Sequence, residues 1–234
     1  MTAAALRALH VPGTPLVLPN VWDVGTARLV VEAGFPVVAT SSAAVAESMG
    51  YADHQGAPAE AMLAVAARIA EALDVPVTVD AEAGYGLPAA ELAGRLVSAG
   101  VVGCNLEDTA HGSVIPVSTQ AAYLSEVRAS GLVVNARVDT FIGVEDQESV
   151  LPEAVARAKA YLAAGADCVY PILLRSVSLV QAFVDAVDGP VNAVLMPGMT
   201  VSSLASAGVA RVSTGPGLWR VTQSVLRERL ATLP

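Results

Sequence analysis

Lysine is almost absent from this chain of 234 residues, and its single copy, Lys159, falls in a segment whose pattern predicts a helix. Schiff-base chemistry requires a reactive lysine amine in the active site. Because Lys159 does not stand at the end of a predicted strand, the sequence argues against an aldolase of the Schiff-base class. The chain also lacks a glycine-rich phosphate loop of the P-loop type.

Charged residues are scarce and mostly acidic. They make up 15% of the chain, and the formal net charge is −9. A nucleic-acid-binding protein normally presents a basic face, so this balance argues against a nucleic-acid partner. It leaves room for a small anionic substrate, because a bound metal and one arginine can reverse the local field.

Long apolar runs are missing as well, although 54% of the residues are hydrophobic. Polar residues and glycines interrupt every run before it approaches the ~18 residues that a membrane span needs. The N-terminal stretch 1–13 lacks the apolar core of a signal peptide. We therefore expect a cytoplasmic protein that does not enter the membrane. The two cysteines, Cys104 and Cys168, lie in apolar strand-like runs and are interpreted as buried small hydrophobes.

What the chain does contain is a regular alternation of short valine-rich runs and alanine-rich amphipathic segments. The runs predict strands at 15–18, 36–40, 75–80, 101–107, 131–136, 167–171, 190–194 and 209–213. The segments between them predict helices at 23–33, 57–73, 88–99, 118–130, 149–164, 176–187, 200–207 and 217–231. Eight repeated βα units predict one (β/α)8 TIM barrel domain over residues 1–234. The alternative is an open doubly wound sheet, which would usually carry a glycine fingerprint where this chain has PNVWD.

Acidic side chains follow two neighbouring predicted strands. Asp80 and Glu82 stand two residues apart and so point the same way, and Glu107 closes the next strand. Barrel enzymes place their chemistry at this end of the strands. Carboxylates gathered without a cationic neighbour repel one another unless a proton or a cation intervenes. Oxygen ligands of this kind suit Mg²⁺, and the sequence predicts a metal site among these carboxylates and the adjacent Asp108. An acidic, solvated strand end without a metal is the alternative.

Other polar residues at strand ends predict contacts to the substrate. Arg137 can grip a planar carboxylate or phosphate with two hydrogen bonds, although a structural bridge to Asp108 or Asp139 is an alternative role. The small-residue turn after the second strand can offer amide groups to an anion. The predicted substrate-binding set is Ser41, Ser42, Ala43, Asp80, Arg137 and Asn192.

Two loops at the same rim are candidate lids. Residues 49–56 form a long βα loop that carries Asp53 and His54, and residues 109–117 form a second candidate flap that carries His111. Ordinary surface loops are the alternative in both places. We include Asp53 and His111 with Arg137 among the candidate catalytic residues.

Taken together, these motifs resemble the isocitrate lyase/phosphoenolpyruvate mutase superfamily over nearly the whole chain. The resemblance rests on PNVWDVGTARL, TSSAAVAESMGYAD, DAEAGYG, GVVGCNLED and NARVDTF. It implies that Asp80 contacts Mg²⁺, with Mn²⁺ as a substitute, and that Glu82 and Glu107 reach the metal through water. It also implies that Arg137 and the turn at Ser41–Ala43 hold a 2-oxo acid, and that Asp53 belongs to a mobile loop near the metal. The implied chemistry is formation of a metal-stabilised enolate of a pyruvate-like unit.

One segment departs from the pattern of the superfamily. Isocitrate and methylisocitrate lyases carry a flap with Lys-x-Cys-Gly-His, and phosphonopyruvate enzymes carry Lys and Asn there, whereas this chain has TAHGSVIPV. We therefore expect a lyase that cleaves a C–C bond of a small 2-oxo or 2-hydroxy acid, similar to an oxaloacetate decarboxylase. The alternatives are a phosphonomutase or phosphonopyruvate hydrolase acting on a P–C bond, and a non-catalytic 2-oxo-acid-binding protein. The resemblance also implies a homo-oligomer, a dimer or a tetramer, and leaves open whether the C-terminal helix is exchanged between subunits.

Overall fold

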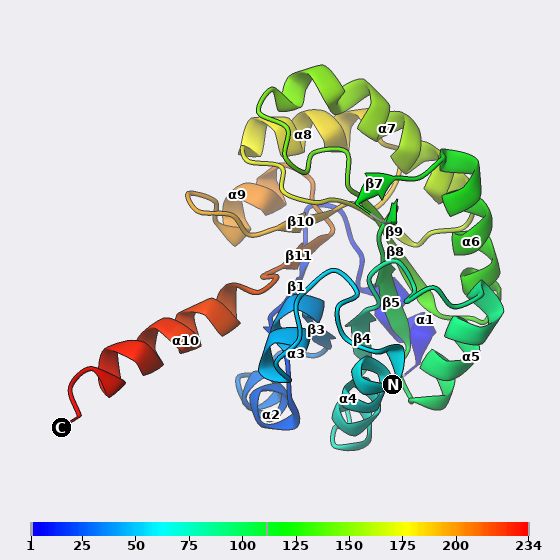
Figure 1. Ribbon diagram of the computed structural model, residues 1–234. Helices are drawn as coiled ribbons and strands as arrows, with labels where there is room; N and C mark the ends of the chain where they lie inside the picture. The colour runs from blue at the N-terminus through cyan, green and yellow to red at the C-terminus, as the bar shows by residue number, and fades with distance from the viewer. Residues whose placement is uncertain (1, 111, 234) are drawn as a thin grey trace.

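Parallel strands form the centre of the fold, and helices surround them (Figure 1). The computed structural model describes residues 2–110 and 112–233. The central strands are β1 (Leu16–Leu18), β2 (Asn20–Val21), β3 (Val38–Thr40), β4 (Val77–Asp80), β5 (Gly103–Leu106), β8 (Val133–Val138), β9 (Cys168–Pro171), β10 (Asn192–Val194) and β11 (Arg211–Ser213). Pro19 separates β1, at the first predicted strand, from β2, which lies beyond the predicted range, since proline has no amide hydrogen for the ladder.

The eight predicted helices are confirmed to within about two residues at each end. They are α2 (Val24–Glu32), α4 (Ala59–Glu71), α5 (Ala89–Ser98), α6 (Val117–Ala129), α7 (Gln147–Ala163), α8 (Val177–Ala186), α9 (Val201–Ser206) and α10 (Gly217–Leu230). Helix α9 shows why they begin where they do. The Thr200 hydroxyl accepts a hydrogen bond from the Ser203 amide at 3.0 Å, and the Ser203 hydroxyl accepts one from the Thr200 amide. The two bonds form a capping box.

Hydrogen-bonded pairings run around the whole ring of strands. One ladder joins β2, β3, β4, β5, β8 and β9, and another joins β1, β11 and β10, all in parallel. The segment 16–21 connects the ladders on one side, because β1 pairs with β11 and β2 pairs with β3. On the other side a parallel bridge joins Val169 to Val191. The fold is the (β/α)8 TIM barrel that the sequence predicts, and not the open doubly wound sheet.

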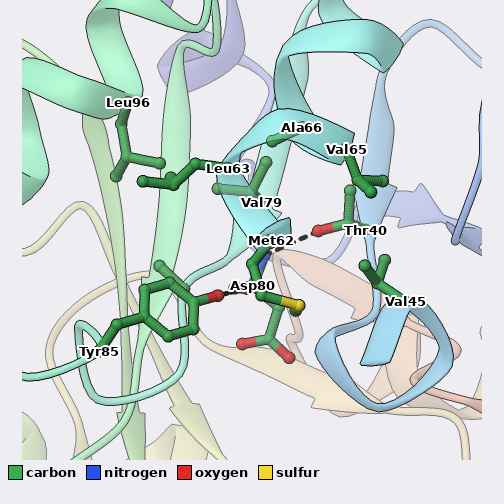
Figure 2. Close-up of a pocket in the computed structure, with 11 residues that line it drawn as sticks. Thr40, Val45, Met62, Leu63, Val65, Ala66, Val79, Asp80, Tyr85 and Leu96 are labelled. Atoms are coloured by element: carbon green, nitrogen blue, oxygen red, sulfur yellow. Dashed lines mark hydrogen bonds between the residues drawn. The ribbon is translucent and has the colours of Figure 1, made fainter. Parts of the chain in front are cut away.

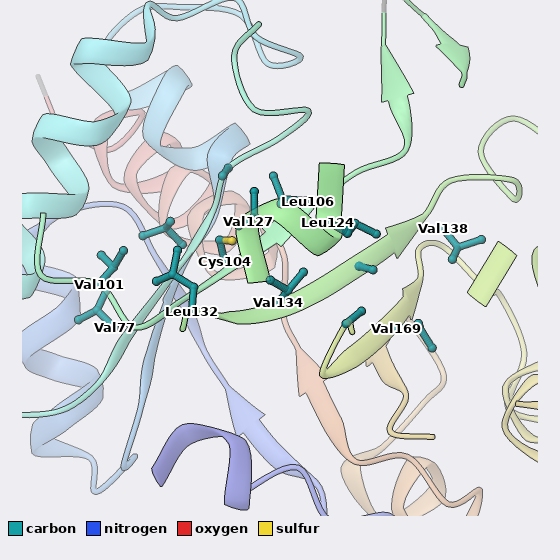
Figure 3. Packing of buried hydrophobic residues seen from close by; sticks show 14 of the residues in the cluster. Val77, Val101, Cys104, Leu106, Leu124, Val127, Leu132, Val134, Val138 and Val169 are labelled. Atoms are coloured by element: carbon teal, nitrogen blue, oxygen red, sulfur yellow. The ribbon is translucent and has the colours of Figure 1, made fainter. Parts of the chain in front are cut away.

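The core lies between the strands and the surrounding helices. Figure 3 shows Leu124 and Val127 of α6 facing Leu106 of β5 and Val134 of β8, and all four are buried. Such contacts account for the uninterrupted apolar strands, which are covered on both sides. Cys104 lies in the same cluster, fully buried, and burial raises the pKa of its thiol to about 12. Cys168 is buried in the same way, so both cysteines are core residues as predicted.

Besides β2, four short elements lie outside the predicted set. Helix α1 (Ala3–Ala8) precedes the barrel, and β6 (Thr109–Ala110) pairs with β7 (Ser113–Val114) as an antiparallel hairpin within the predicted flap. Helix α3 (Ser42–Ser48) stands where the sequence predicts a turn. That prediction was wrong in detail: Ser41 accepts a hydrogen bond from the Ala44 amide at 3.4 Å, which caps the helix, and the chain coils immediately after β3.

Helix α10 extends away from the barrel (Figure 1), and none of its residues is buried. Its first turn is held at the barrel by Trp219, whose indole Nε1 donates to Glu47 at 2.6 Å and whose ring meets Trp22 edge to face. Beyond that turn its apolar side chains are exposed. No helix in the described ranges is long and apolar enough to cross a bilayer. The single lysine, Lys159, is exposed on α7.

Candidate active site

Asp80 stands at the C-terminal end of β4, and Figure 2 shows its surroundings. Its Oδ2 atom accepts a hydrogen bond from the Ser42 hydroxyl at 2.7 Å, so α3 is tied to the end of β4. The Asp80 amide donates to the Thr40 hydroxyl at 3.0 Å, and the Tyr85 hydroxyl donates to the Asp80 carbonyl at 3.2 Å. These bonds fix the carboxylate in place. The cavity drawn in Figure 2 has a volume of about 10 Å³, room for about one water.

Glu82 follows β4 in a backbone conformation that side chains rarely adopt, with φ at +48°. Its carboxylate is buried and accepts a hydrogen bond from the backbone amide of Gln55. Burial, together with the neighbouring charges of Asp80 and Asp53, raises the pKa of Glu82 to about 7, against the opposing effect of the hydrogen bond from Gln55. Loop 49–56 therefore lies over Glu82 and brings Asp53 close to the acidic cluster, as the sequence predicts for a lid.

Glu107 comes directly after β5 and is 6% exposed. Its amide donates to the Glu82 carbonyl at 2.9 Å, which joins the ends of the two neighbouring strands. Burial raises the pKa of Glu107 to about 8, against the attraction of Arg137 and with further repulsion from Asp139 and Asp80. The three predicted metal ligands thus gather at one place on the barrel rim, where each acidic charge disfavours the others.

Arg137 points from β8 toward this cluster and pairs with two carboxylates. It forms an ion pair with Glu107, and it holds Asp139 through two hydrogen bonds, Nε to Oδ1 at 2.5 Å and Nη2 to Oδ2 at 2.9 Å. Burial opposes the charge, but the bonds to Asp139 keep the pKa of Arg137 above its usual range. The alternative role of Arg137, a structural bridge to Asp139, is therefore present, and this bridge places the guanidinium group at the rim.

Behind the site lies a second polar network that sequence reasoning missed. Asp108 is fully buried, and its Oδ2 accepts hydrogen bonds from the Tyr161 hydroxyl at 2.6 Å and from Arg157 at 3.3 Å. Its Oδ1 accepts from the Asp139 amide at 2.8 Å. Arg157 also donates to the Ile115 carbonyl at 2.9 Å, at the end of the flap. Helix α7 thereby supports both Asp139, the partner of Arg137, and the base of the flap.

A cavity of about 830 Å³ opens beside Glu107 and Arg137. Its walls come from loop 49–56, the loop after β4, the β6–β7 hairpin and the loop after β8. The lining residues are His54, Gln55, Ala83, Tyr85, Gly86, Glu107, Thr109, Ala110, Gly112, Val114, Arg137, Asp139, Thr140 and Ile142. Both candidate lids therefore border the cavity, which has the size of a small-molecule site.

Several predicted residues do not line this cavity, and Asp80 lines the smaller cavity of Figure 2 instead. The others outside the lining are Ser41, Ser42, Ala43, Asp53 and Glu82. Asn192 is fully buried on β10, where its side-chain amide donates to the Ser213 hydroxyl at 3.1 Å, and it does not line the cavity. His111 lies outside the described residues. The roles assigned to the remaining residues, from Ser41 to Arg137, stay predictions.

The donor set fits a metal ion that keeps part of its water shell. In the described part of the chain, no group of three or more His, Cys, Asp or Glu side chains converges closely enough to hold a metal by direct bonds. Mg²⁺ commonly takes only one or two carboxylates directly and retains several waters. Asp80 in direct contact, with Glu82 and Glu107 acting through water, is an arrangement that the observed residues can provide.

Comparison with known proteins places the chain in a family. Residues 6–233 match the model of the family described as phosphoenolpyruvate phosphomutase. The chain belongs to this family. Its members include enzymes, and this chain shares their fold over its described length, so we treat it as an enzyme of the phosphoenolpyruvate mutase/isocitrate lyase superfamily.

Similar proteins in the superfamily are named for different activities. A protein named as a candidate 2-methylisocitrate lyase of Corynebacterium glutamicum is 35% identical over 204 residues, which cover 81% of this chain and 65% of that protein. A structure from Burkholderia cenocepacia J2315, described as a candidate phosphonomutase, is 38% identical with a TM-score of 0.94 and covers 99% of both chains. The structure of 2,3-dimethylmalate lyase is 25% identical with a TM-score of 0.87 and covers 100% of this chain and 88% of that one.

Proposed function

We propose that the protein is a divalent-metal-dependent lyase that cleaves a C–C bond of a small 2-oxo or 2-hydroxy acid, similar to an oxaloacetate decarboxylase. The observation that carries this proposal is the group formed by Asp80, Glu82 and Glu107, of which Glu107 lines the 830 Å³ cavity together with its ion-pair partner Arg137. Mg²⁺ is the metal that the all-oxygen donors suit, with Mn²⁺ as a substitute.

Asp80 would hold the metal directly, and Glu82 and Glu107 would hold it through water. The raised pKa values of Glu82 and Glu107 support this assignment, because burial and neighbouring negative charges raise them and a bound cation would offset both. When bound, the metal would stabilise negative charge developing on the 2-oxo oxygen. Ser42 already bonds to Asp80, so the first turn of α3 lies next to the place where a 2-oxo acid would bind.

Arg137 would bind a carboxylate of the substrate by exchanging one of its present partners for it. Its planar fork suits such an anion, and Asp139 would keep the guanidinium oriented while Glu107 turns to the metal. Cleavage leaves the electron pair of the broken bond on the 2-oxo acid fragment, which then needs one proton. His54 lines the cavity and can deliver it, and we keep His111 as the other candidate donor.

A P–C bond enzyme is the second candidate. The likeness to the structure described as a phosphonomutase favours it, whereas the flap, which lacks the lysine and asparagine of phosphonopyruvate enzymes, favours the C–C lyase. A non-catalytic 2-oxo-acid-binding protein is the third. We also propose that the protein assembles as a homo-oligomer, a dimer or a tetramer.

Pyruvate release tests these candidates together. Oxaloacetate, 2-methylisocitrate and phosphonopyruvate would each be supplied with Mg²⁺, and each yields pyruvate on cleavage. We expect release from a C–C substrate, its loss with EDTA, and a loss of about 10³-fold or more in Asp80→Ala. Asp74→Ala, which removes an exposed carboxylate in the loop that precedes β4, is the control. Release from phosphonopyruvate alone would establish hydrolysis of the P–C bond, and conversion of phosphonopyruvate to phosphoenolpyruvate in phosphorus NMR would establish a phosphonomutase. Metal-dependent binding without turnover of any compound would favour the binding protein.

A further inference from the structure

A fully buried arginine lies inside the barrel. Arg211 begins β11 and is 1% exposed. Its Nη2 atom donates to the side-chain oxygen of Asn105 at 3.0 Å, whereas Nε and Nη1 have no hydrogen-bond partner among the described residues. Burial lowers the pKa of Arg211, but a guanidinium group keeps its proton in proteins. A buried charge without full compensation costs stability, so we looked for its role in the candidate site.

The charge of Arg211 has little compensation nearby. Within the described part of the chain it takes part in no ion pair. Cys168 and Cys104 act on it, but burial raises the pKa of both thiols to about 12, so they are neutral near neutral pH. Asp80 is the carboxylate whose charge favours the charged form of Arg211. The positive charge of Arg211 therefore acts on the residue that stands at the centre of the predicted metal site.

Asn105 connects this arginine to the site. It stands on β5, where its Cα partners are Asp80 of β4 on one side and Asn135 of β8 on the other. Directly paired residues project from the same face of a sheet. Strands β5 and β11 are not neighbours in the ladders, so the bond from Arg211 to Asn105 crosses the inside of the barrel. The side chains of Asp80, Asn105 and Asn135 therefore lie next to one another on the inner face.

The neighbours of Asn105 fix the orientation of its amide group. Its oxygen accepts hydrogen bonds from Arg211 at 3.0 Å and from the Asn135 amide at 2.8 Å. Arginine only donates, so the oxygen and not the nitrogen of Asn105 must face it. Asn135 lies on the flank away from β4, which leaves the Nδ2 atom of Asn105 toward β4, where Asp80 stands. Among the described residues that atom has no partner, and it is not one of their enclosed unpartnered atoms, so a water or a ligand oxygen can touch it.

We propose that Asn105 is a further catalytic residue, whose Nδ2 amide donates a hydrogen bond to the 2-oxo oxygen as that oxygen becomes the enolate oxyanion, and that Arg211 is its positioning residue. This inference rests on the proposed function and adds two residues to it. The cation bonded to the Asn105 oxygen polarises the amide, which makes its N–H a stronger donor. The bond to the ligand strengthens as negative charge develops, so it favours the transition state more than the bound substrate.

Oxalate and pyruvate distinguish this role from ordinary binding. Oxalate is planar and carries negative charge where the enolate of pyruvate would carry it, whereas the 2-oxo oxygen of pyruvate is neutral. With Mg²⁺ present, calorimetry should show that Asn105→Ala weakens oxalate binding at least about tenfold and pyruvate binding less than about threefold. Equal losses for the two ligands, or no loss for either, would overturn the proposal.

Asn105→Asp is the matched variant. It keeps an oxygen acceptor for Arg211 and Asn135, pairs the buried guanidinium group with a carboxylate, and removes the amide donor. We expect a melting temperature equal to or above that of the unmodified protein and an oxalate affinity at least about tenfold lower. The control is Thr78→Val, which removes a buried, unpartnered hydroxyl from β4 two residues before Asp80 and should change oxalate affinity less than about twofold. Unchanged oxalate binding in Asn105→Asp would contradict the role of the amide.

Arg211→Met tests the positioning role. The change removes a poorly compensated charge at similar side-chain length, so the melting temperature should stay the same or rise. Oxalate affinity should nevertheless fall at least about fivefold, because the Asn105 amide loses the group that orients and polarises it. A structural role alone predicts the opposite pattern, a lower melting temperature with unchanged oxalate affinity, and that result would remove Arg211 from the proposal.

Exchange of the pyruvate methyl hydrogens for deuterium, followed by NMR with Mg²⁺, separates this inference from the function on which it rests. Exchange in the unmodified protein shows enolate formation, and Asn105→Asp should slow it about 10²-fold. If the variant exchanges at the unmodified rate, the role of Asn105 is wrong and the proposed function stands. If oxalate binding depends on Asn105 but no exchange occurs, the contact stands and the proposed reaction is wrong. If the unmodified protein neither exchanges nor binds oxalate, both are wrong.

Discussion

Glu82 and Glu107 hold their protons more tightly than isolated carboxyl groups do. Burial is the main cause for both, and the negative charge of Asp80 adds to it in each case. A buried carboxyl that stays protonated near neutral pH is a poor metal ligand until the proton leaves. The same environment that keeps water out of the site therefore makes metal binding depend on pH.

We expect the affinity for Mg²⁺ to rise with pH, by at least about tenfold between pH 6 and pH 8.5. The folded pKa values, about 7 for Glu82 and about 8 for Glu107, lie above the ordinary value of 4.5, so metal binding must displace protons in this window. Titration calorimetry in two buffers of different ionisation enthalpy would count the protons released. An affinity that does not change over this range would show that these carboxyls do not serve the metal.

The same pKa shifts make a prediction for the metal-free protein. Between pH 4.5 and pH 8 the folded state binds more protons than the unfolded state, so the free energy of unfolding falls as pH rises through this range. Thermal melts in EDTA should show the melting temperature declining by several degrees from pH 5.5 to pH 8.5. Mg²⁺ should restore it at the higher pH. A melting temperature that rises across this window would contradict the assigned protonation states.

Tyr161 supports the active site from behind, so its removal should affect both stability and binding. Tyr161→Phe deletes the 2.6 Å hydrogen bond to the buried Asp108, and we expect a loss of about 1–3 kcal/mol in the free energy of unfolding. KM should rise more than kcat falls, because the Asp108–Asp139 contact orients Arg137. Tyr51→Phe, on an exposed loop residue, is the matched control and should change stability by less than about 0.5 kcal/mol.

The acidic residues of the site could be predicted from the sequence, but the hydrogen bonds from α7 that support the site could not. Asp80, Glu82 and Glu107 follow apolar strands, and the parallel arrangement brings such ends together. Arg157 and Tyr161 lie in the middle of a helix, where their spacing is that of an ordinary amphipathic segment. Only the packing of α7 behind β8 turns them toward Asp108.

At the scale of elements, the loop after β4 determines where Glu82 points. Gly84 has φ at +86°, and a Cβ atom added there would lie 2.2 Å from the Tyr123 hydroxyl. Tyr123 in turn donates to the Leu87 carbonyl at 3.0 Å, which closes the loop against α6. The loop is therefore held by close packing around a residue without a side chain.

Gly84→Ala should destabilise the protein by about 2–4 kcal/mol, since it combines an unfavourable backbone conformation with a clash. Metal affinity should fall as well, because the Glu82 carboxylate would shift. The control is Gly94→Ala in the middle of α5, where a Cβ atom meets nothing within 4 Å. That change should raise stability by about 0.5–1 kcal/mol. Chemical denaturation of both variants checks the prediction, and a neutral Gly84→Ala would contradict the packing argument.

The βα units were predictable because their apolar periodicity is long and regular. Helices α1 and α3 and the β6–β7 hairpin were not, since each is short and its apolar residues do not repeat. In α3 the small residues after Ser41 are as typical of a turn as of a helix. The hydrogen bond that the Ser42 hydroxyl donates to Asp80 favours the helix. Short elements at the rim are therefore determined by tertiary contacts more than by pattern.

For the whole molecule, α10 is the feature that the barrel alone does not explain. Val221, Val225, Leu226 and Leu230 are each about half exposed or more. A helix that leaves its apolar side chains in water is incomplete until another surface covers them. A second copy of the chain would supply that surface, in agreement with the proposed homo-oligomer.

We expect a dimer or a tetramer in light scattering after size-exclusion chromatography. The double change Val221→Glu and Val225→Glu should shift the protein toward the monomer by at least about tenfold in dissociation constant. Ser224→Glu adds a charge on the opposite side of α10, as the helical repeat of 100° per residue places it, and should leave the assembly intact. A monomeric unmodified protein would show that α10 is covered in some other way.

The single lysine has a practical consequence. Lys159 is exposed on α7, and no residue of α7 lines the 830 Å³ cavity. Apart from the α-amino group, amine-reactive dyes and supports will therefore couple at one place on the outer wall, away from the substrate. A lysine-specific protease can cut only after Lys159, and a helix must open locally before it fits a protease. One cut would then separate the segment that carries β1 to β8 from the segment that carries β9 to β11, so that two fragment bands on a gel report the opening of the barrel.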